Sequence, residues 1–486
     1  MFKKLLFFSF DSKVKTSIFK RFVLKYRIAE RYIRSDIPFG YFFENINQGK
    51  KEPRMSLDPQ AQSLNDIIAK ANPSVFGMLS EKGKAIFFPK LGILSQSAEA
   101  AGKKINATIG IALEDSGSPM VLDILSSLVN LKKTEGFPYA PSQGRPDIRA
   151  TWKQMMVRKN PSMEGKTVSQ PVVSCALTHG LSMAGYLFAD RGDVVISPDR
   201  YWENYDLIFS NACGAAIETF PAFIENSAFN VAGLRDKLLE TAPGKKLVLL
   251  NFPNNPTGYT VSENEAAAIR NVLVEAAEAG NSIVVLIDDS YFGLVYEEGI
   301  LRESIFAMLA DAHERILAVK LDGPTKEDYV WGFRVGFVTF GVKNATAELY
   351  ASLEAKLAGA VRGSISNASN IAQVLLQNAY TNEAYAAEKQ VKYATLERRY
   401  RAIRELIAAH PEYRDYFYPL PFNSGYFMCI SIKSGNAEKV RQVLLSKYST
   451  GVIAQNDILR IAFSSTPLEL IGTLFDNCYN AAKECA

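Results

Sequence analysis

Residues 247–287 read LVLLNFPNNPTGYTVSENEAAAIRNVLVEAAEAGNSIVVLI, and this stretch decides the fold class. Two short runs rich in Val, Leu and Ile, Leu247–Leu250 and Ile283–Ile287, flank an amphipathic segment over Ser262–Ala279. Short apolar runs that alternate with segments of helical length are typical of strand–helix–strand units, whose parallel strands are buried on both faces. A third apolar run, Ile316–Lys320, repeats the pattern. The sequence therefore predicts an α/β protein with a mostly parallel sheet covered by helices.

The composition of the chain excludes several classes of protein. Its 486 residues are 48% hydrophobic and 22% charged, which suits two ordinary globular domains rather than a disordered tail. A net charge of +4 is small for a chain that wraps nucleic acid, so we expect no nucleic-acid partner. The five cysteines are scattered and the three histidines lack metal-ligand spacing, so we expect no metal ion and a reducing, cytoplasmic location. No apolar run approaches the ~18 residues that span a bilayer, which argues against an integral membrane segment.

The first 54 residues differ in composition from the rest. They contain twelve Phe or Tyr residues, and thirteen basic against five acidic residues make this segment +8 and the remaining chain −4. A targeting leader, a membrane-surface segment and an extension upstream of a start at Met55 all remain open. We assign this segment no function.

Polar residues follow each of the three apolar runs, at the ends where open α/β sheets bind ligands. Asn254 and Asn255 follow the first run, within a sequence that suits either a tight turn or contact with an oxygen of a bound ring. Asp288 follows the second, where a carboxylate would keep a nearby heterocyclic nitrogen protonated. Lys326 and Arg334 follow the third, and a reactive amine beside a fixed guanidinium suits a phosphorylated cofactor that carries a carbonyl group.

Together the three ends resemble the pyridoxal phosphate (PLP) site of class I aminotransferases of fold type I, with the aspartate and aromatic enzymes closest in pattern. The resemblance covers roughly residues 73–486 in order. It implies a large PLP-binding domain over residues 118–395, with a central, mostly parallel sheet flanked by helices. It also implies a smaller α+β domain made of residues 55–117 and 396–486, so that residues 1–54 form an N-terminal extension.

The resemblance implies three catalytic residues. Lys326 would form the Schiff base with the cofactor and move the α-proton of the substrate. Asp288 would pair with the pyridine nitrogen, and Tyr291, three residues later, would reach the phenolic oxygen together with Asn255 of Asn-Pro-Thr-Gly.

The same resemblance implies a phosphate site. Arg334 would pair with the phosphate, with Thr325 as a partial substitute for the serine of the family's Ser-x-x-Lys, because this chain has Gly-Pro-Thr-Lys. The segment Leu177–Ser182 resembles the loop that opens a helix, where free N–H groups favour a phosphate. We therefore expect Gly180, Leu181 and Ser182 to bind it, although Leu181 stands where a hydroxyl residue is usual.

Two aromatic residues match positions at the edge of the family site. Trp202 resembles the residue that stacks on the cofactor ring, and we prefer it to the neighbouring Tyr201. Tyr139, in Tyr-Ala-Pro-Ser-Gln-Gly, resembles the tyrosine that contacts the phosphate of the neighbouring subunit. The resemblance thus implies a homodimer with shared active sites.

Substrate contacts are implied for four residues. Arg460 resembles the arginine that grips the α-carboxylate, a task suited to a planar guanidinium. Gly110 belongs to a segment that resembles the strand beside that carboxylate, which Asn255 would also approach. Arg362 resembles the arginine that the partner subunit lends to a distal carboxylate, but it can equally be an ordinary helix-end charge.

We therefore expect an enzyme that transfers an amino group from an L-amino acid, with aspartate or an aromatic donor favoured, to a 2-oxo acid such as 2-oxoglutarate. Residues 327–333 are more acidic and aromatic than is usual in the family, so the exact donor stays open. A PLP-dependent lyase or decarboxylase would use the same cofactor residues. A non-catalytic regulator with an aminotransferase-like domain is a further alternative, but residues 1–54 show no clear helix-turn-helix pattern.

Overall fold

A computed structural model of the chain describes residues 57–88 and 92–486. The segment Pro59–Ala486 forms one compact unit. The predicted extension, residues 1–54, lies outside the described residues. Among the helices that are described, none is both long enough and apolar enough to cross a bilayer.

A seven-stranded sheet forms the larger part of the unit, with strand order β2-β10-β9-β8-β7-β3-β4. Five neighbouring strands are parallel, and β10 runs antiparallel to both β9 and β2. The predicted mostly parallel sheet is therefore confirmed. The strands are β2 (Val172–Ser174), β3 (Val194–Pro198), β4 (Ala216–Phe220), β7 (Lys245–Asn251), β8 (Ser282–Asp288), β9 (Ile316–Asp322) and β10 (Gly336–Gly341).

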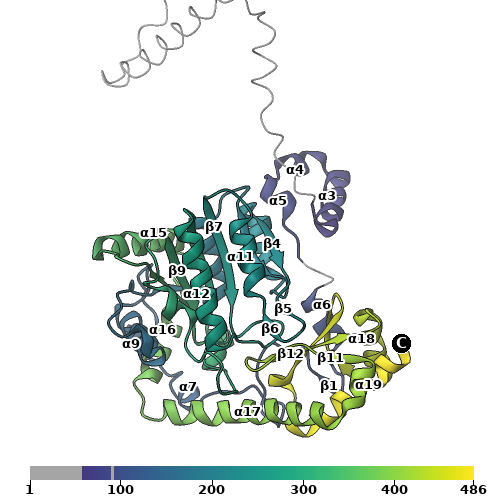
Figure 1. Cartoon of the computed structure of the whole chain (residues 1–486). Coiled ribbons are helices and arrows are strands. Elements are labelled where there is room, and N and C mark those ends of the chain that lie inside the picture. The colour runs from purple at the N-terminus through teal and green to yellow at the C-terminus, as the bar shows by residue number, and fades with distance from the viewer. Residues whose placement is uncertain (1–56, 89–91) are drawn as a thin grey trace, which may run out of the picture. The chain divides into compact units, whose positions relative to one another are not determined.

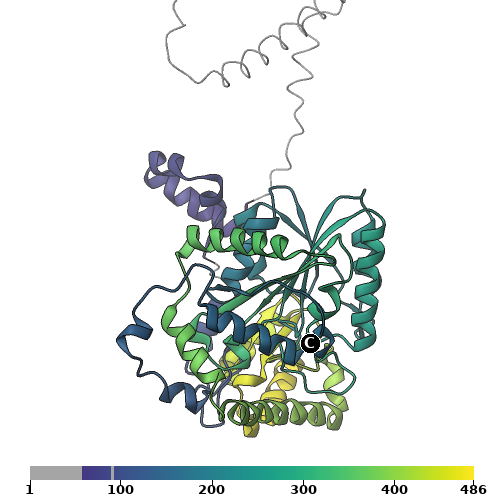
Figure 2. The same ribbon diagram turned by 90° about the vertical axis from the view of Figure 1, so that its left-hand side faces the viewer.

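Helices cover both faces of this sheet (Figures 1 and 2). Val248 and Leu250 of β7 pack with one helical layer, whereas Leu247 and Leu249 pack with the other. Burial on both faces explains why the strands are continuous apolar runs rather than alternating ones. The first layer contains α11 (Val231–Leu239), α12 (Glu263–Glu278) and α13 (Ile305–Leu309), and the second contains α10 (Ala176–Phe188) and α15 (Ala347–Ile365).

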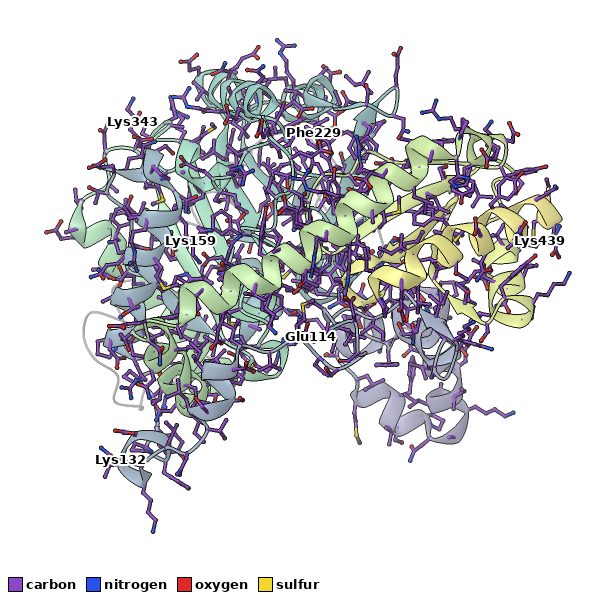
Figure 3. All side chains as sticks on the ribbon, turned by 90° about the horizontal axis from the view of Figure 1, so that it is seen from below. Glu114, Lys132, Lys159, Phe229, Lys343 and Lys439 are labelled. Carbon is purple, nitrogen blue, oxygen red and sulfur yellow. The ribbon has the colours of Figure 1, made fainter. Side chains whose placement is uncertain are left out.

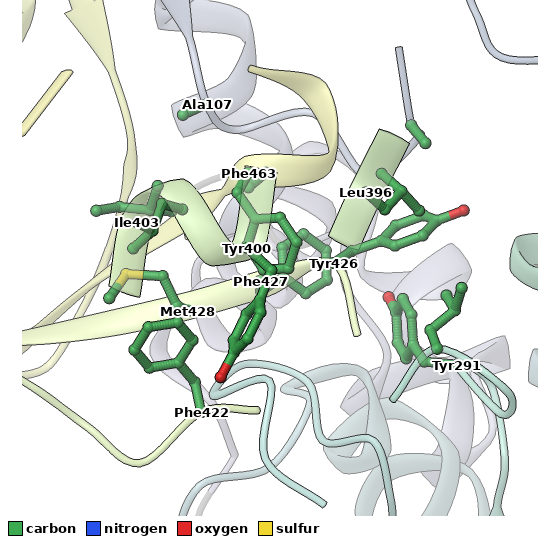
Figure 4. Packing of buried hydrophobic residues seen from close by; sticks show 14 of the residues in the cluster. Ala107, Tyr291, Leu396, Tyr400, Ile403, Phe422, Tyr426, Phe427, Met428 and Phe463 are labelled. Atoms are coloured by element: carbon green, nitrogen blue, oxygen red, sulfur yellow. The ribbon is translucent and has the colours of Figure 1, made fainter. Parts of the chain in front are cut away.

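A second, four-stranded antiparallel sheet has the order β11-β12-β15-β14. Its core includes Phe427 and Met428 of β12 and Tyr426, the residue just before this strand. Tyr400 and Ile403 of a long helix pack against them (Figure 4). The elements of this region are β11 (Phe417–Pro419), β12 (Phe427–Ile432), α18 (Ala437–Lys447), β14 (Ile453–Gln455), β15 (Ile458–Ala462) and α19 (Ile471–Cys485).

An early segment of the chain joins this second sheet region. The strand β1 (Ile105–Asn106) pairs in parallel with β13 (Thr450–Gly451). The amide of Ala462 also donates to the carbonyl of Ala107. Residues near position 105 therefore lie beside residues near positions 450 and 460.

The long helix α17 (Tyr385–Ala409) has 25 residues and runs along the lower edge of the molecule in Figure 1, from the side of α7 to that of α19. It contacts α19 and the turn that follows β15. The remaining elements are α3 (Pro59–Ala71), α4 (Pro73–Met78), α5 (Glu81–Ala85), α6 (Ile93–Glu99), α7 (Asp123–Ser127), α8 (Lys133–Gly136), α9 (Pro146–Lys159), β5 (Phe223–Ile224), β6 (Ala228–Phe229), α14 (Pro324–Glu327) and α16 (Asn370–Tyr380).

Candidate active site

The carboxyl ends of β7, β8 and β9 bring the three predicted polar segments together. In the sheet register Asn251 lies opposite Asp288, and Asp288 lies opposite Leu321. The side chain of Asn251 donates to the carbonyl of Asp288 at 2.7 Å and accepts from the amide of Asn255 at 2.8 Å. Asn251, which the sequence analysis did not single out, thus ties the Asn-Pro-Thr-Gly turn to the end of β8.

Asp288 is a buried carboxylate, only 2% exposed, that accepts three hydrogen bonds. The hydroxyl of Tyr205 donates to Oδ2 at 2.6 Å, and the amide and hydroxyl of Ser290 both donate to Oδ1. Burial, together with the nearby Asp288, raises the pKa of Tyr205 well above its usual range, so Tyr205 stays protonated and acts as a donor. These donors stabilise a negative charge on Asp288 and fix the direction of its oxygens.

Lys326 lies in α14, the short helix that follows β9. Its ammonium group lies 5.0 Å from the ring centroid of Tyr291. Burial lowers the pKa of Lys326 to about 8; nearby Asp288 opposes this effect and Arg334 adds to it. A large fraction of the amine is therefore neutral near pH 8, as a nucleophile or base requires. The Lys326 carbonyl accepts from the Tyr426 hydroxyl at 2.7 Å, which joins α14 to the second sheet.

Tyr291 lies at the boundary between the two sheets. Its ring packs edge-on against Tyr426, with centroids 5.4 Å apart, and against Phe427, with centroids 5.7 Å apart (Figure 4). Burial raises the pKa of Tyr291, while Arg460 has the opposite effect. The hydroxyl therefore stays protonated at neutral pH and can donate a hydrogen bond.

Arg460 projects from β15 of the second sheet and meets the loop that follows β7. Its Nη1 donates to Asn255 Oδ1 at 3.1 Å, and the guanidinium carbon lies 4.4 Å from the ring centroid of Phe427. The side chain is buried, and its Nε has no hydrogen-bond partner among the described residues. An unpaired buried donor is costly, so this guanidinium is suited to a carboxylate ligand.

The predicted phosphate loop is where the structure differs from the sequence analysis. The helix α10 already begins at Ala176, so Gly180, Leu181 and Ser182 lie in its second turn, where backbone amides bond within the helix. Leu181 is buried in the core, and the hydroxyl of Ser182 donates to the carbonyl of Thr178 at 2.9 Å. The prediction was wrong in register for these three residues.

The free N–H groups at this helix end belong to earlier residues. An α-helix leaves the amides of its first turn without intrahelical partners, which here are those of Ala176, Leu177 and Thr178. The amide of Cys175 donates to His179 Nδ1 at 3.1 Å, and burial lowers the pKa of His179, so its neutral ring can accept. The residue at the N-cap position is Cys175 rather than the usual Ser, Thr, Asp or Asn. A cap by a histidine four residues later has no recognisable sequence pattern, so the start of the helix could not be predicted.

Two further predicted phosphate ligands lie near Lys326: Thr325 precedes it in α14, and Arg334 is close enough to influence its charge. The hydroxyl of Thr325 is buried and has no hydrogen-bond partner within residues 57–88 and 92–486. Arg334 adopts a left-handed backbone conformation, with φ 54°, and its Nη1 donates to the carbonyl of Trp331 at 3.2 Å. The side chain of Arg334 is exposed and thus free to meet an anion.

The other predicted residues are divided between the site and the surface. Trp202 packs edge-on against Tyr205, the partner of Asp288, with centroids 5.6 Å apart. Gly110 follows the segment that bonds to Ala462. Tyr139 is 92% exposed, and the exposed Arg362 donates to Ser366 at its own helix end. Within residues 57–88 and 92–486, no hydrogen bond, ion pair or ring contact joins Tyr139 or Arg362 to Lys326.

Residues 102–474 match the family described as aminotransferase class I and II, and the chain belongs to this family. The predicted family, fold class and enzyme class are thereby confirmed, and neither the lyase nor the regulator is favoured. Members of this family are PLP-dependent.

Individual relatives are distant. A probable N-acetyl-LL-diaminopimelate aminotransferase of Bacillus subtilis is 28% identical over 202 residues, which is 41% of this chain and 47% of that protein, so the match spans about half of that relative. A probable aspartate/prephenate aminotransferase of Aquifex aeolicus is 25% identical over 75% of this chain and 87% of its own length. Among solved structures, an aminotransferase from Anaerococcus prevotii has a TM-score of 0.73 at 23% identity and covers 83% of this chain and 98% of its own. Aspartate aminotransferase from Thermus thermophilus with maleate has a TM-score of 0.65 at 19% identity, with coverages of 83% and 99%. These two structures establish the fold alone.

Proposed function

We propose that this protein is a PLP-dependent aminotransferase that moves the amino group of an L-amino acid, with aspartate or an aromatic donor favoured, to a 2-oxo acid such as 2-oxoglutarate. The observation that carries the proposal is the hydrogen bond from Arg460 to Asn255. It joins a carboxylate-binding side chain of one sheet to the strand ends of the other, where Lys326 and Asp288 lie. The Aquifex aeolicus relative, named as a probable aspartate/prephenate aminotransferase, supports aspartate as the donor.

The residues present fit PLP. Asp288 is a buried anion for the pyridine nitrogen, and Lys326 is an amine with a lowered pKa. The unpartnered hydroxyl of Thr325, the exposed guanidinium of Arg334 and the free amides that begin α10 suit its phosphate. Trp202 offers an aromatic face to the ring, and Asn255 and Tyr291 offer donors to its phenolic oxygen. When bound, PLP supplies an electron-withdrawing ring that stabilises negative charge at the substrate α-carbon.

The protein groups would then share the work of positioning and proton transfer. Arg460 binds the α-carboxylate of the donor through its free Nε and orients the Cα–H bond. Nζ of Lys326, in its neutral form, takes the proton from that carbon. Tyr205 and Ser290 donate to Asp288 and hold its oxygens in place, so that this carboxylate can pair with the pyridine nitrogen. The acceptor 2-oxo acid binds to Arg460 in the same way and receives its proton from Lys326.

We also propose a homodimer with shared active sites. Tyr139 and the nearby Phe137 are 92% and 80% exposed, which is unusual for aromatic side chains of a monomer. Tyr139 of one subunit would contact the phosphate held by the other, and Arg362 would contact a distal substrate carboxylate.

In support of the predicted domains, the seven-stranded sheet lies within residues 118–395 and the four-stranded sheet within residues 396–486. A cytoplasmic location completes the proposal.

Purified protein loaded with PLP tests the function. We expect visible absorption that depends on Lys326, and borohydride should fix the cofactor to the peptide that contains this residue. A donor panel of aspartate, tyrosine, alanine and leucine with 2-oxoglutarate then identifies the preferred substrate. Lys326→Ala should abolish turnover. Release of ammonia or carbon dioxide from aspartate without any 2-oxo acid would instead establish a lyase.

A further inference from the structure

Two buried carboxylates follow Lys326 directly in the chain. Glu327 is 4% exposed and Asp328 is fully buried. Adjacent buried acids repel each other and lose hydration, so they persist only where cations and hydrogen-bond donors surround them.

Two lysines from distant helices supply the positive charge. Lys159, the last residue of α9, donates to both oxygens of Glu327, at 2.8 and 3.0 Å. Lys389, in the second turn of α17, bridges the two acids, with Nζ 2.6 Å from Glu327 Oε2 and 2.8 Å from Asp328 Oδ1. We call Lys159, Glu327, Asp328 and Lys389 the charge cluster.

Two tyrosines complete the hydrogen bonding of Asp328. The hydroxyl of Tyr385 in α17 donates to Oδ1 at 2.7 Å, and that of Tyr380 in α16 donates to Oδ2 at 2.9 Å. Burial opposes the charge on Glu327, but Lys159 and Lys389 outweigh it and hold the pKa of Glu327 below its ordinary value. The two acids hold the pKa of Lys389 well above its usual range. Glu327 and Lys389 therefore remain ionised at neutral pH.

The charge cluster anchors the backbone of Lys326. The helix α14 has only four residues, too few for its own hydrogen bonds to hold it in place. On one side the Lys326 carbonyl accepts from Tyr426 of the second sheet. On the other side, Glu327 and Asp328 are tied to α9, α16 and α17. The position of the lysine amine thus depends on side chains that are remote in sequence.

The same helix α17 also reaches the strand end that carries Arg460. Nη1 of Arg399 donates to the carbonyl of Ser464 at 2.6 Å, in the turn that directly follows β15. The helix crosses the face turned to the viewer in Figure 3, where Lys159 and Glu114 are labelled. One rigid element therefore contacts both the turn of Lys326 and the turn after Arg460.

We propose that Lys389 is a positioning residue for Lys326: by neutralising and holding Glu327 and Asp328, it fixes the turn of Lys326 on α17 and keeps the surroundings of the amine from becoming net negative. The inference rests on the proposed role of Lys326. It goes beyond that role because it assigns a function to residues outside the cofactor contacts.

The other titratable groups near the charge cluster and Lys326 come from several elements. Asp322 of β9 and the Tyr329 hydroxyl interact with the charge cluster, and Glu114 acts on Tyr329. Asp288 and Arg334 act on Lys326 itself. These groups are the same in all the variants below, so the direction of a shift in the midpoint reports the change of charge in the cluster.

A pH titration of visible absorption in the PLP-loaded, full-length protein tests the proposal. Lys389→Met leaves the charge cluster net negative, which favours the protonated form of the nitrogen at position 326, so the midpoint should move up by about half a pH unit. Asp328→Asn leaves it net positive, and its midpoint should move down by a similar amount. Lys389→Arg keeps the charge and should titrate like the wild type.

Lys392→Met is the matched control, because Lys392 lies one turn further along α17 and pairs with Glu114 instead. Its midpoint should not move. Turnover in Lys389→Met should fall about tenfold, with the donor KM changed less than twofold, since the bound donor would meet a displaced base. If Lys389→Met does not fold, Asp328→Asn alone tests the proposal. A downward shift of its absorption midpoint cannot come from general loosening of the turn, because loosening does not shift the midpoint in a defined direction.

Equal midpoints in Asp328→Asn and the wild type, or shifts of Asp328→Asn and Lys389→Met in the same direction, would overturn the positioning role and leave the proposed function intact. A wild-type protein that shows no absorption dependent on Lys326 would refute the proposed function itself. The two failures are therefore distinguishable.

Discussion

Single side chains decide the chemistry, and Lys326 is the clearest example. Its amine is useful only when neutral, and burial lowers its pKa to about 8, against the opposing effect of Asp288. The sequence placed this lysine after a strand, but the surroundings that lower its pKa come from several parts of the chain.

We expect the reactivity of Lys326 in cofactor-free protein to follow this pKa. The rate of modification by PLP or an acylating reagent should rise about tenfold for each pH unit below pH 8 and level off above it, because only the neutral amine reacts. Mass spectrometry of the peptide that contains Lys326 measures the rate. The Lys326→Ala protein gives the background modification of other lysines. A modification rate that still rises tenfold per pH unit at pH 10 would contradict a pKa of about 8 for Lys326.

Arg460→Lys should lower kcat/KM about 100-fold, equivalent to about 2.7 kcal/mol, although the charge is kept. A lysine cannot reproduce both the bond to Asn255 and the paired contact with a carboxylate. Steady-state kinetics with the preferred donor measures the effect. Arg404→Lys, at a half-exposed position of α17, is the control and should behave like the wild type; an Arg460→Lys protein equally unaffected would remove Arg460 from the site.

At the scale of elements, the contact between the loop after β7 and strand β12 holds the two sheets in register. Gly258 has φ +73°, and a Cβ atom there would lie 1.8 Å from the carbonyl oxygen of Phe427. No side chain fits without moving one of the two backbones. This approach sets the distance between Asn255 and Arg460.

Gly258→Ala should therefore destabilise the protein by at least about 3 kcal/mol, through backbone strain and steric overlap. Gly359→Ala is the matched control: this residue lies within helix α15 with nothing within 4 Å of its Cβ position, so alanine should stabilise by up to about 1 kcal/mol. Denaturant unfolding of both variants measures the difference. Equal stabilities of the two proteins would show that the loop can move away from β12.

The elements also show the limits of sequence patterns. The strands β7, β8 and β9 were recognisable because burial on both faces requires continuous apolar runs. The predicted start of α10 was misplaced because the cap comes from within the helix. The ring of His179 accepts from the amide of Cys175, four residues earlier in the chain. Sequence patterns identify a helix start from a capping residue that precedes the helix, so they do not detect a cap provided by His179.

At the scale of the whole molecule, a homodimer would complete sites that one chain leaves open. Tyr139 and Arg362 are both exposed, and neither contacts Lys326 among the described residues of the single chain. Their family positions have meaning only if a second subunit presents them.

Mixed dimers test this arrangement. Lys326→Ala and Tyr139→Ala should each be impaired alone, whereas a co-expressed mixture should recover activity, because one hybrid site contains an intact Lys326 and an intact Tyr139 from the other subunit. Turnover of the purified hybrid, with its mass measured by sedimentation, reads out the result. Activity no higher than the average of the two parents would place Tyr139 outside the partner's site.

The amino-acid sequence by itself determined the fold class, the family and the residues at the three strand ends, because both the strands and the family motif are local patterns. Only the tertiary structure decided the partners of those residues. Tyr205 on Asp288, Arg460 on Asn255, and Lys159 and Lys389 around Glu327 are separated by 62 to 205 residues. Contacts over such separations arise from the packing of whole elements, and neither local periodicity nor the spacing of a motif contains them.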